Sequence, residues 1–532
     1  MPPMRPQQSS AQAFDELQDR VRALYGEFGN RAQTKEEEKV IDVAKEAWIK
    51  PTLKLVLPVG AVGVGLTYTV GTQTQILNLV LLAITGGLLW WLIAKHPVHV
   101  AARCLLAVSL FIESPAETPT WWLAPLRAVD LAFFESMKDF AGVPGMSLPI
   151  FFFACLGLLY KARRAAKKGG YLPPRVAVVV MLAFLGAVFA LEGWGLARGG
   201  QLTPSFFQIL HLMTMPVVGL MFLYAIRGPE DVPALGSIVV TVAVLRAAVL
   251  ILVYSVVARD FRDREGFYVT THSDTVLFVA GIIGLFTYAL ENRKMKTIAK
   301  CAGLGLVILA AIALNNRRLA FVSMGAFPIV MYVAMRPGKL KRNLTGLAVV
   351  AGILGAIYVV AGAQLGGDSA LFKPARLIMS VMTQTDTSSE SRDVENYNLI
   401  HTLRQSPVVG MGFGHGYVEQ YHLFDIADLF ALYLFIPHNG VLWIWAVGGV
   451  VGFTALWFVY PVAGTMAMRA YRGAKTPLDR MSGLTALGTV IACVAQVWGD
   501  QGFNSYMTLT LFALAYAISV RTDAAQGVRD GR

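Results

Sequence analysis

Long apolar segments recur along this chain, and they constrain its fold more than any other feature. Residues 235–257 (LGSIVVTVAVLRAAVLILVYSVV) and 275–290 (TVLFVAGIIGLFTYAL) are two examples, and similar segments recur from residue 52 to residue 520. A transmembrane helix needs about 20 predominantly apolar residues, whereas a membrane β-barrel shows short alternating segments. Since 55% of the 532 residues are hydrophobic and 15% are charged, the sequence predicts an all-α polytopic membrane protein.

We predict about 12–14 transmembrane helices of this length. The predicted spans lie near residues 52–70, 74–94, 98–112, 147–160, 175–196, 205–226, 235–257, 274–290, 297–314, 319–335, 344–362, 439–463, 482–499 and 505–520. Basic loops at 161–170, 291–300, 335–343 and 468–480 then fall on one side of the membrane, together with the N-terminus. Lysine and arginine are enriched in cytoplasmic loops, so both termini are predicted to be cytoplasmic.

The predicted organisation has five parts. They are a polar cytoplasmic or membrane-surface segment (1–51), a first group of spans (52–362), a large loop (363–438), the last spans (439–520) and a cytoplasmic tail (521–532). The basic loops account for the net charge of +12, so no nucleic-acid partner is expected. The four cysteines show no CxxC spacing, so neither a disulfide nor a metal cluster is expected.

Two long connections fall on the non-cytoplasmic side. Residues 113–146 place aromatic and charged residues at helical spacing, which predicts an interfacial helix anchored by Trp121 and Trp122. Residues 363–438 form the largest loop, and a connection of this length is uncommon without a function or internal structure. The large loop is therefore the place to search for a functional site.

Within the large loop, the sequence predicts a helix followed by a glycine-rich turn. Thr387 and Glu390 have the spacing of a capping box, and Ser406-Pro407 ends the apolar periodicity that follows. Glycines then occupy positions 410, 412, 414 and 416. No GxxxxGK[ST] motif is present, so a nucleotide-binding loop is rejected. Gly412 and Gly414 either bring backbone close to a ligand or let the turn pack against a span.

Several arginines lie where basic residues are not expected. Arg317 and Arg318 open a predicted span from the non-cytoplasmic side, with no acidic residue near them in sequence. Arg259 lies on the same side beside Asp260, Arg392 lies in the large loop, and Arg246 lies within the 235–257 run. An arginine in mid-membrane costs at least ~2.5 kcal/mol, so Arg246 should face a partner or a polar cavity. These guanidinium groups suit a diphosphate ligand, because they bind phosphate oxygens in a bidentate manner.

Among the other polar residues of the loop, His438 stands directly before a long apolar run. Pro437 precedes it, and Asn439 is a plausible N-cap of the following helix. The positive end of that helix would disfavour imidazolium and keep the ring neutral, as a base requires.

Two other features of the loop have ordinary explanations. The histidines His401, His415 and His422 are each predicted to be solvated or structural. His415, which adjoins the glycine turn, is also a candidate substrate contact of the loop, together with Gly412, Gly414 and Arg392. The pair Asp393-x-Glu395 could hold a divalent ion, but two acidic residues this close are common, and no metal site is predicted.

The arginine pair at the start of a span, the loop ending in SPVVGMGFGHG and the following PHNGVLWIWAVGGVVGFTALW together resemble the O-antigen ligase and O-antigen polymerase superfamily, most clearly over residues 310–460. The resemblance implies a GT-C-like membrane glycosyltransferase of the bacterial inner membrane that needs neither metal nor cofactor. It implies an undecaprenyl-diphosphate-linked glycan donor, an acceptor that is lipid A core or a growing polysaccharide, and a periplasmic active site. The family's loop histidine falls on His438, and its diphosphate-binding arginine falls on Arg317 or Arg318.

The residues and the resemblance are chemically consistent. A lipid-linked diphosphate sugar is already activated, so fixed arginines would stabilise the leaving diphosphate and a neutral histidine would accept the proton of the acceptor hydroxyl. The alternatives are a transporter or flippase, which would usually show acidic residues or broken helices at mid-membrane, and a non-catalytic scaffold or sensor. The sequence does not separate a ligase of lipopolysaccharide biosynthesis from an O-antigen or exopolysaccharide polymerase.

Overall fold

The protein was analysed as a computed structural model, which describes residues 48–70, 75–113, 124–257, 272–292, 294–315, 318–365, 372, 387–422, 432–500 and 502–529. These residues form helices joined by turns, and their only β-type contact is an isolated bridge between Ser136 and Pro149. Eight of the described helices are long and apolar enough to cross a membrane, and three shorter helices are also apolar. The prediction of an all-α polytopic membrane protein is confirmed.

Each predicted span coincides with a helix, except that one span corresponds to two helices, α18 and α19. The helices that correspond to the predicted spans are α3 (Ile49–Val70), α4 (Gln75–Lys95), α5 (Val98–Ile112), α8 (Ile150–Gly169), α9 (Arg175–Ala197), α10 (Leu202–Ala225), α11 (Val232–Leu252), α12 (Ser273–Asn292), α13 (Met295–Asn315), α14 (Arg318–Ala334), α15 (Lys339–Leu365), α18 (Gly440–Trp457), α19 (Val459–Gly473), α20 (Pro477–Gly499) and α21 (Tyr506–Arg529). Helix α11 continues as the π-helical turn η2 (Val253–Val257). Among the eight helices that are long and apolar enough to cross a membrane, α10 is the most enclosed, since 83% of its apolar window is buried.

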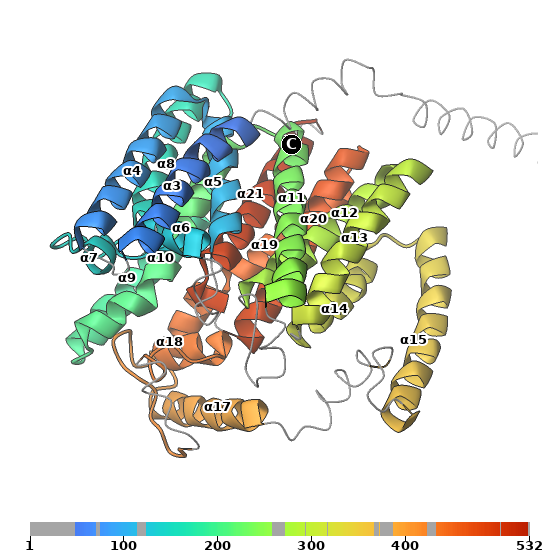
Figure 1. Ribbon diagram of the computed structural model, residues 1–532. Coiled ribbons are helices and arrows are strands. Elements are labelled where there is room, and N and C mark those ends of the chain that lie inside the picture. Colours follow the sequence, from blue (N-terminus) through green and yellow to red (C-terminus); the bar gives the residue numbers. More distant parts are fainter. Residues whose placement is uncertain are drawn as a thin grey trace, which may run out of the picture.

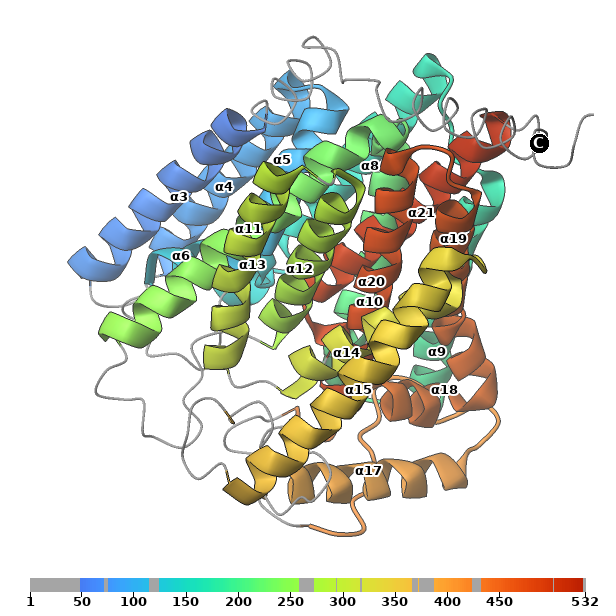
Figure 2. The ribbon, with the colours of Figure 1, turned by 90° about the vertical axis from the view of Figure 1, so that its right-hand side faces the viewer.

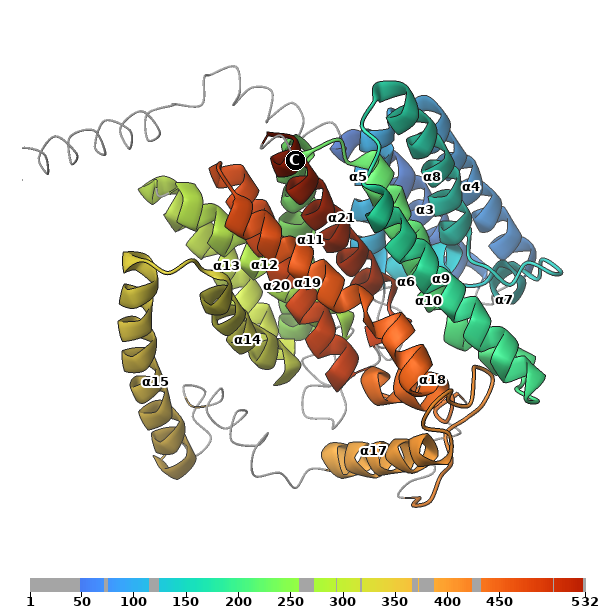
Figure 3. The same ribbon diagram turned by 180° about the vertical axis from the view of Figure 1, so that it is seen from behind.

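The bundle has two distinct ends, which Figures 1, 2 and 3 show from three sides. We call the end of the bundle where the last helix of the chain finishes the C-terminal end. There, Arg480 pairs with Glu291 at 2.8 Å, and Arg521 donates to the carbonyls of Tyr171 and Leu223, both at 2.8 Å. These contacts bring the ends of α8, α10, α12 and α21 together with the start of α20. The described basic loops thus gather at one end, as the predicted topology requires. Helix α17 (Thr387–Gln405) lies across the opposite end, called the α17 end below.

The helix expected in the first long connection exists, but the structure places it inside the bundle. Trp121 and Trp122 lie outside the described residues. Helix α6 (Ala124–Phe134) contacts α3, and its Val129 and Phe133 are at most 1% exposed. The described apolar residues of α6 thus pack against protein, and the interfacial position anchored by Trp121 and Trp122 stays a prediction. The short helix α7 (Met137–Ala141) follows and is capped by Ser136.

Helix α18 is interrupted within the bundle. Gly449 has a φ of 57°, which breaks the helix that began at Gly440. Residues 407–412, which follow α17, supply hydrogen-bond partners to the interrupted segment: Val450 and Val451 donate to the carbonyls of Pro407 and Val408, and Met411 and Gly412 donate to those of Ala446 and Val447. We refer to residues 407–412 as the strap. The strap joins the end of α17 to the middle of α18 and so fixes the position of α17 relative to α18.

Candidate functional site

His438 lies beside a carboxylate at the α17 end. Its Nδ1 is 3.2 Å from Glu395 Oε1, and its backbone N–H donates to Glu395 Oε2 at 3.0 Å. A carboxylate only accepts hydrogen bonds, so Nδ1 carries a proton, and a neutral ring presents Nε2 as its acceptor. The His438 side chain is 37% exposed and that of Glu395 is 10% exposed. This arrangement gives a partly accessible base oriented by a largely buried acid.

A second imidazole–carboxylate pair lies next to the first. His272, directly before α12, forms an ion pair with Asp500, directly after α20. Arg392 of α17 donates to the carbonyl of Gly499 at 3.0 Å, which ties α17 to the same turn. Burial alone would raise the pKa of Asp500, but His272, Arg392 and His438 lower it to about 2. Five ionisable groups from four parts of the chain therefore converge at this site.

The ionisation of His438 differs from the sequence-based expectation. Burial lowers its pKa, but the hydrogen bond and charge of Glu395 and the charge of Asp500 raise it more, so the net pKa is above its ordinary value. The position before a helix was expected to keep the ring neutral, and that expectation omitted the neighbouring carboxylates. Glu395 is suited to stabilising an imidazolium that forms when His438 accepts a proton.

Local sequence explains how His438 is held. The Asn439 side chain accepts from the Leu442 N–H at 3.1 Å, which confirms it as the N-cap of α18. Its amide also donates to Asn396 of α17 at 3.0 Å. On the other side, Gln208 of α10 donates to the carbonyl of Phe435 at 2.8 Å. These bonds fix the backbone on both sides of His438.

The glycine turn packs against the bundle. Gly412 and Gly414 have φ values of 83° and 84°, which L-residues with side chains rarely adopt. A Cβ at Gly412 would lie 2.2 Å from the Cα of Gly195 in α9. Gly414 donates to the Gln208 side chain at 2.6 Å. Of the two alternatives for these glycines, the structure shows packing against a span, while their place in a substrate loop stays a prediction.

The remaining loop histidines also have protein partners. His415 Nε2 is 3.1 Å from the carbonyl of Gly195, His422 lies 3.0 Å from Glu419, and His401 lies 3.0 Å from Gln405. His415 was considered as a substrate contact because it adjoins the glycines. Its contact with α9 is structural, and its contact with a substrate stays a prediction.

Arg246 has the partner that its position in a span requires. The pair with Asp274 of α12 is bidentate, with Nη2 2.9 Å from Oδ2, and Nη1 donates to the carbonyl of Phe111 at 2.6 Å. Three of the guanidinium's donors therefore bind protein acceptors, and its proposed contact with a diphosphate stays a prediction. Asp274 is two residues from His272, so this pair lies along the same end of α12 as the site.

The other arginines are less fully described. Arg259 and Arg317 lie outside the described residues, and Arg318 is described only as the first residue of α14. Its neighbour Leu319 approaches the turn that contains Asp500, since a Cβ at Gly499 would lie 2.6 Å from Leu319 Cδ1. The start of α14 thus lies at the same end of the bundle as His438, while the diphosphate-binding role of the pair stays a prediction.

The acidic pair Asp393-x-Glu395 was considered above as a site for a divalent ion. Glu395 bonds to His438, and no group of three His, Cys, Asp or Glu residues with metal-ligand geometry occurs among the residues that the structure describes. The four cysteines are all described, and each is buried and free.

Residues 302–458 match the family model described as O-antigen ligase. The matched segment contains α17, the glycine turn, the strap and His438, whereas His272 and Asp500 lie outside it. The match confirms the resemblance to the O-antigen ligase and polymerase superfamily, and it supports a membrane glycosyltransferase of the O-antigen ligase type in general. No match was found among the curated proteins compared with the chain.

Sequence reasoning had not assigned three residues to this site. Glu395 was considered only as a metal ligand or an arginine partner, and His272 and Asp500 were not singled out. A signal existed for the last two, because each is a polar residue directly at the end of a predicted span. That signal is common, and only the packing of α12 against α20 shows that the two meet.

Proposed function

We propose that this protein transfers a glycan from an undecaprenyl-diphosphate donor to a saccharide acceptor at the periplasmic face of the bacterial inner membrane. The observation that carries the proposal is the His438–Glu395 pair at the start of α18, inside the segment that matches the O-antigen ligase family. Such a transfer requires groups that stabilise the leaving diphosphate, and it requires a base that accepts the proton of the acceptor hydroxyl.

In the proposed reaction, His438 Nε2 accepts the proton of the acceptor hydroxyl as its oxygen bonds to the anomeric carbon. The bond between that carbon and the diphosphate oxygen breaks, and the undecaprenyl diphosphate leaves with the electron pair. Glu395 stabilises the imidazolium that results. Arg317 or Arg318 would bind the diphosphate, since a guanidinium is permanently charged and bidentate. A single displacement of this kind inverts the anomeric configuration and needs no metal.

The decisive experiment is His438→Ala, assayed as transfer from a lipid-diphosphate glycan at matched protein level. We expect transfer to be abolished or strongly reduced while donor binding persists. His422→Ala is the matched control, because this histidine belongs to the same loop and also contacts a glutamate, Glu419. Wild-type turnover by the His438→Ala variant would refute the role of this ring as the base.

His272 offers the site's second imidazole, so a parallel variant, His272→Ala, locates the base. The proposal expects this variant to lose less activity than His438→Ala, because His272 is ion-paired with Asp500, whose pKa is lowered to about 2. A larger loss in the His272 variant would assign proton transfer to that pair instead.

The basic loops at the C-terminal end, opposite His438, support the proposed periplasmic location. Cysteines introduced at Ser369 and Ser389 should react with a membrane-impermeant thiol reagent in intact cells. Labelling only after lysis would place the large loop in the cytoplasm and remove the proposed site from its substrate.

A transporter or flippase is the alternative, and the break in α18 is the observation that favours it, because broken helices occur at transporter sites. The strap fills this break with four backbone hydrogen bonds, which leaves those groups unavailable to a ligand. Purified protein in detergent separates the two functions, since glycan transfer needs no sealed membrane and transport does. Within the enzyme reading, a deletion strain that makes single capped repeats indicates a polymerase, and one that keeps long chains on the carrier lipid indicates a ligase.

A further inference from the structure

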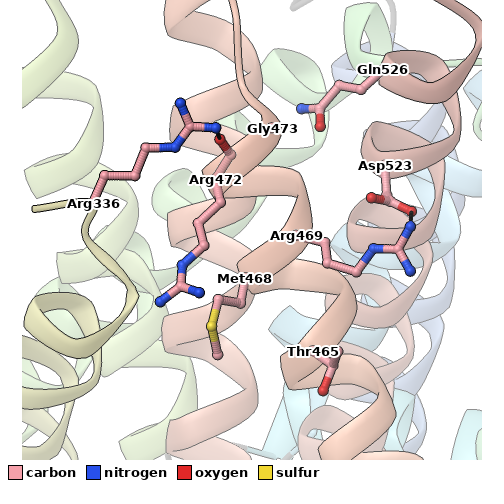
Figure 4. A pocket seen from close by; sticks show the side chains of 8 residues that line it. All are labelled: Arg336, Thr465, Met468, Arg469, Arg472, Gly473, Asp523 and Gln526. Atoms are coloured by element: carbon pink, nitrogen blue, oxygen red, sulfur yellow. Dashed lines mark hydrogen bonds and ion pairs between the residues drawn. The ribbon is translucent and has the colours of Figure 1, made fainter. Parts of the chain in front are cut away.

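A basic pocket lies at the C-terminal end, across the bundle from His438. Its volume is about 380 Å³, and it lies among the last turns of α14, α19 and α21 (Figure 4). Arg336, Arg469 and Arg472 line it together with a single acidic residue, Asp523. The lining therefore carries two net positive charges, and the proposed glycosyl transfer uses none of these residues.

Two of the three arginines also have a structural role. Arg336 donates to the carbonyl of Arg472, at the end of α19. Arg472 in turn donates to the carbonyls of Ala334 and Val333, at the end of α14, at 2.8 and 3.1 Å. Each side chain thus caps the other helix, which suits a cation at a helix C-terminus. A guanidinium has five N–H donors, so these bonds leave further donors on both groups.

Arg469, unlike Arg336 and Arg472, does not cap a helix. Its side chain is 56% exposed and lies 3.3 Å from Asp523, in an ion pair that contributes little to stability at such exposure. Figure 4 shows Arg469 and Arg472 extending from the same helix on either side of Met468. In Figure 4 the Arg469 guanidinium turns toward Asp523 and away from Arg472, so an anion bound at Arg469 would compete with Asp523.

We propose that this pocket binds the phosphate of an anionic phospholipid headgroup. Arginine forks match phosphate oxygens, and basic pockets between transmembrane helices are typical sites for anionic headgroups. The pocket lies where spanning helices end, at the level of a headgroup. Met468 and Thr465 continue its wall toward the middle of α19, where the glycerol and the first acyl carbons would lie. A free cytosolic phosphate would gain nothing from this apolar continuation.

The test measures how much phosphatidylglycerol the full-length protein retains, by native mass spectrometry, after transfer from nanodiscs of mixed phosphatidylglycerol and phosphatidylcholine. Arg469→Gln should lower retention about fivefold, as expected for one cation near an anionic lipid. Asp523→Asn should maintain or raise retention, because it removes the competing acid. Arg163→Gln is the matched control, since Arg163 is exposed on α8 at the same end of the bundle.

Competition with inorganic phosphate distinguishes the two sources of the anion. Unchanged lipid retention in its presence supports a lipid site, whereas displacement of the lipid would assign the pocket to soluble phosphate and overturn the proposal. Equal retention by wild type, Arg469→Gln and Arg163→Gln would also overturn it. Because Arg469 is not a cap, its variant should fold normally, and a melting temperature equal to that of the Arg163 variant verifies this.

Discussion

Replacing Glu395 with glutamine tests how the protein sets the basicity of His438. The carboxylate accepts from both the backbone N–H and the ring Nδ1 of His438, whereas an amide has one acceptor oxygen for these two donors. Hydrogen bonds to charged groups contribute about 1.5–3 kcal/mol and neutral ones about 0.5–1.5 kcal/mol. We therefore expect Glu395→Gln to remove about 1.4 kcal/mol of the stabilisation of the protonated His438 ring. This corresponds to about a tenfold loss of maximal transfer rate.

The pH dependence of the rate gives a second readout with a definite sign. Glu395 helps to raise the pKa of His438 above its ordinary value, so removing its charge lowers that pKa. The proposed reaction requires the neutral ring, and the acidic limb of the rate–pH profile should therefore move to lower pH in Glu395→Gln. A purely structural loss would lower the rate without moving this limb.

The matched control is Glu419→Gln, which makes the same change in the loop's other glutamate–histidine pair. We expect its rate and its pH profile to equal those of wild type. If Glu395→Gln also keeps the wild-type rate and acidic limb, Glu395 does not act on His438 during transfer, and the reasoning is wrong.

Three further predictions follow from the contacts of the site and from the sequence. Asn439→Ala should lower the free energy of unfolding by about 2 kcal/mol, from a lost cap and a lost bond to α17, and unchanged melting in detergent would contradict this. Gly412→Ala should lower the free energy of unfolding by at least about 2 kcal/mol, because the φ of Gly412 is positive and the backbone of α9 blocks a Cβ there. Gly303→Ala, which has open space around it, should melt like wild type. Lysine at both Arg317 and Arg318 should lower transfer at least ~10-fold, about 1.4 kcal/mol, because lysine lacks the planar fork, and normal transfer at normal protein level would eliminate the proposed diphosphate contact.

Sequence reasoning located the helices well because each is a continuous apolar segment that must satisfy its own backbone in lipid. It also required a partner for Arg246, since an unpaired guanidinium is costly within a span. It did not identify Asp274 as that partner, because the pairing depends on how α11 packs against α12. Local periodicity predicts that a helix exists, but it does not predict which other helix packs against each face.

The same limit applies to the site. His438 was found because its position directly before a span and its place in a family motif are both local features. Glu395 was visible in the sequence, but its link to a residue 43 positions later is made only when α17 lies across the bundle. The pKa of His438 was consequently predicted from the helix end alone, and the neighbouring acids reverse the direction.

The strap has a consequence for how this region can be exchanged between proteins. The interrupted backbone of α18 obtains four hydrogen bonds from residues 407–412, and each unsatisfied group within a membrane costs several kcal/mol. A chimera that takes the loop from one homologue and the span from another would have to restore these four backbone hydrogen bonds one by one. Residues 387–457 therefore form a single module for recombination: a graft intended to change acceptor preference should keep its boundaries outside both α17 and α18.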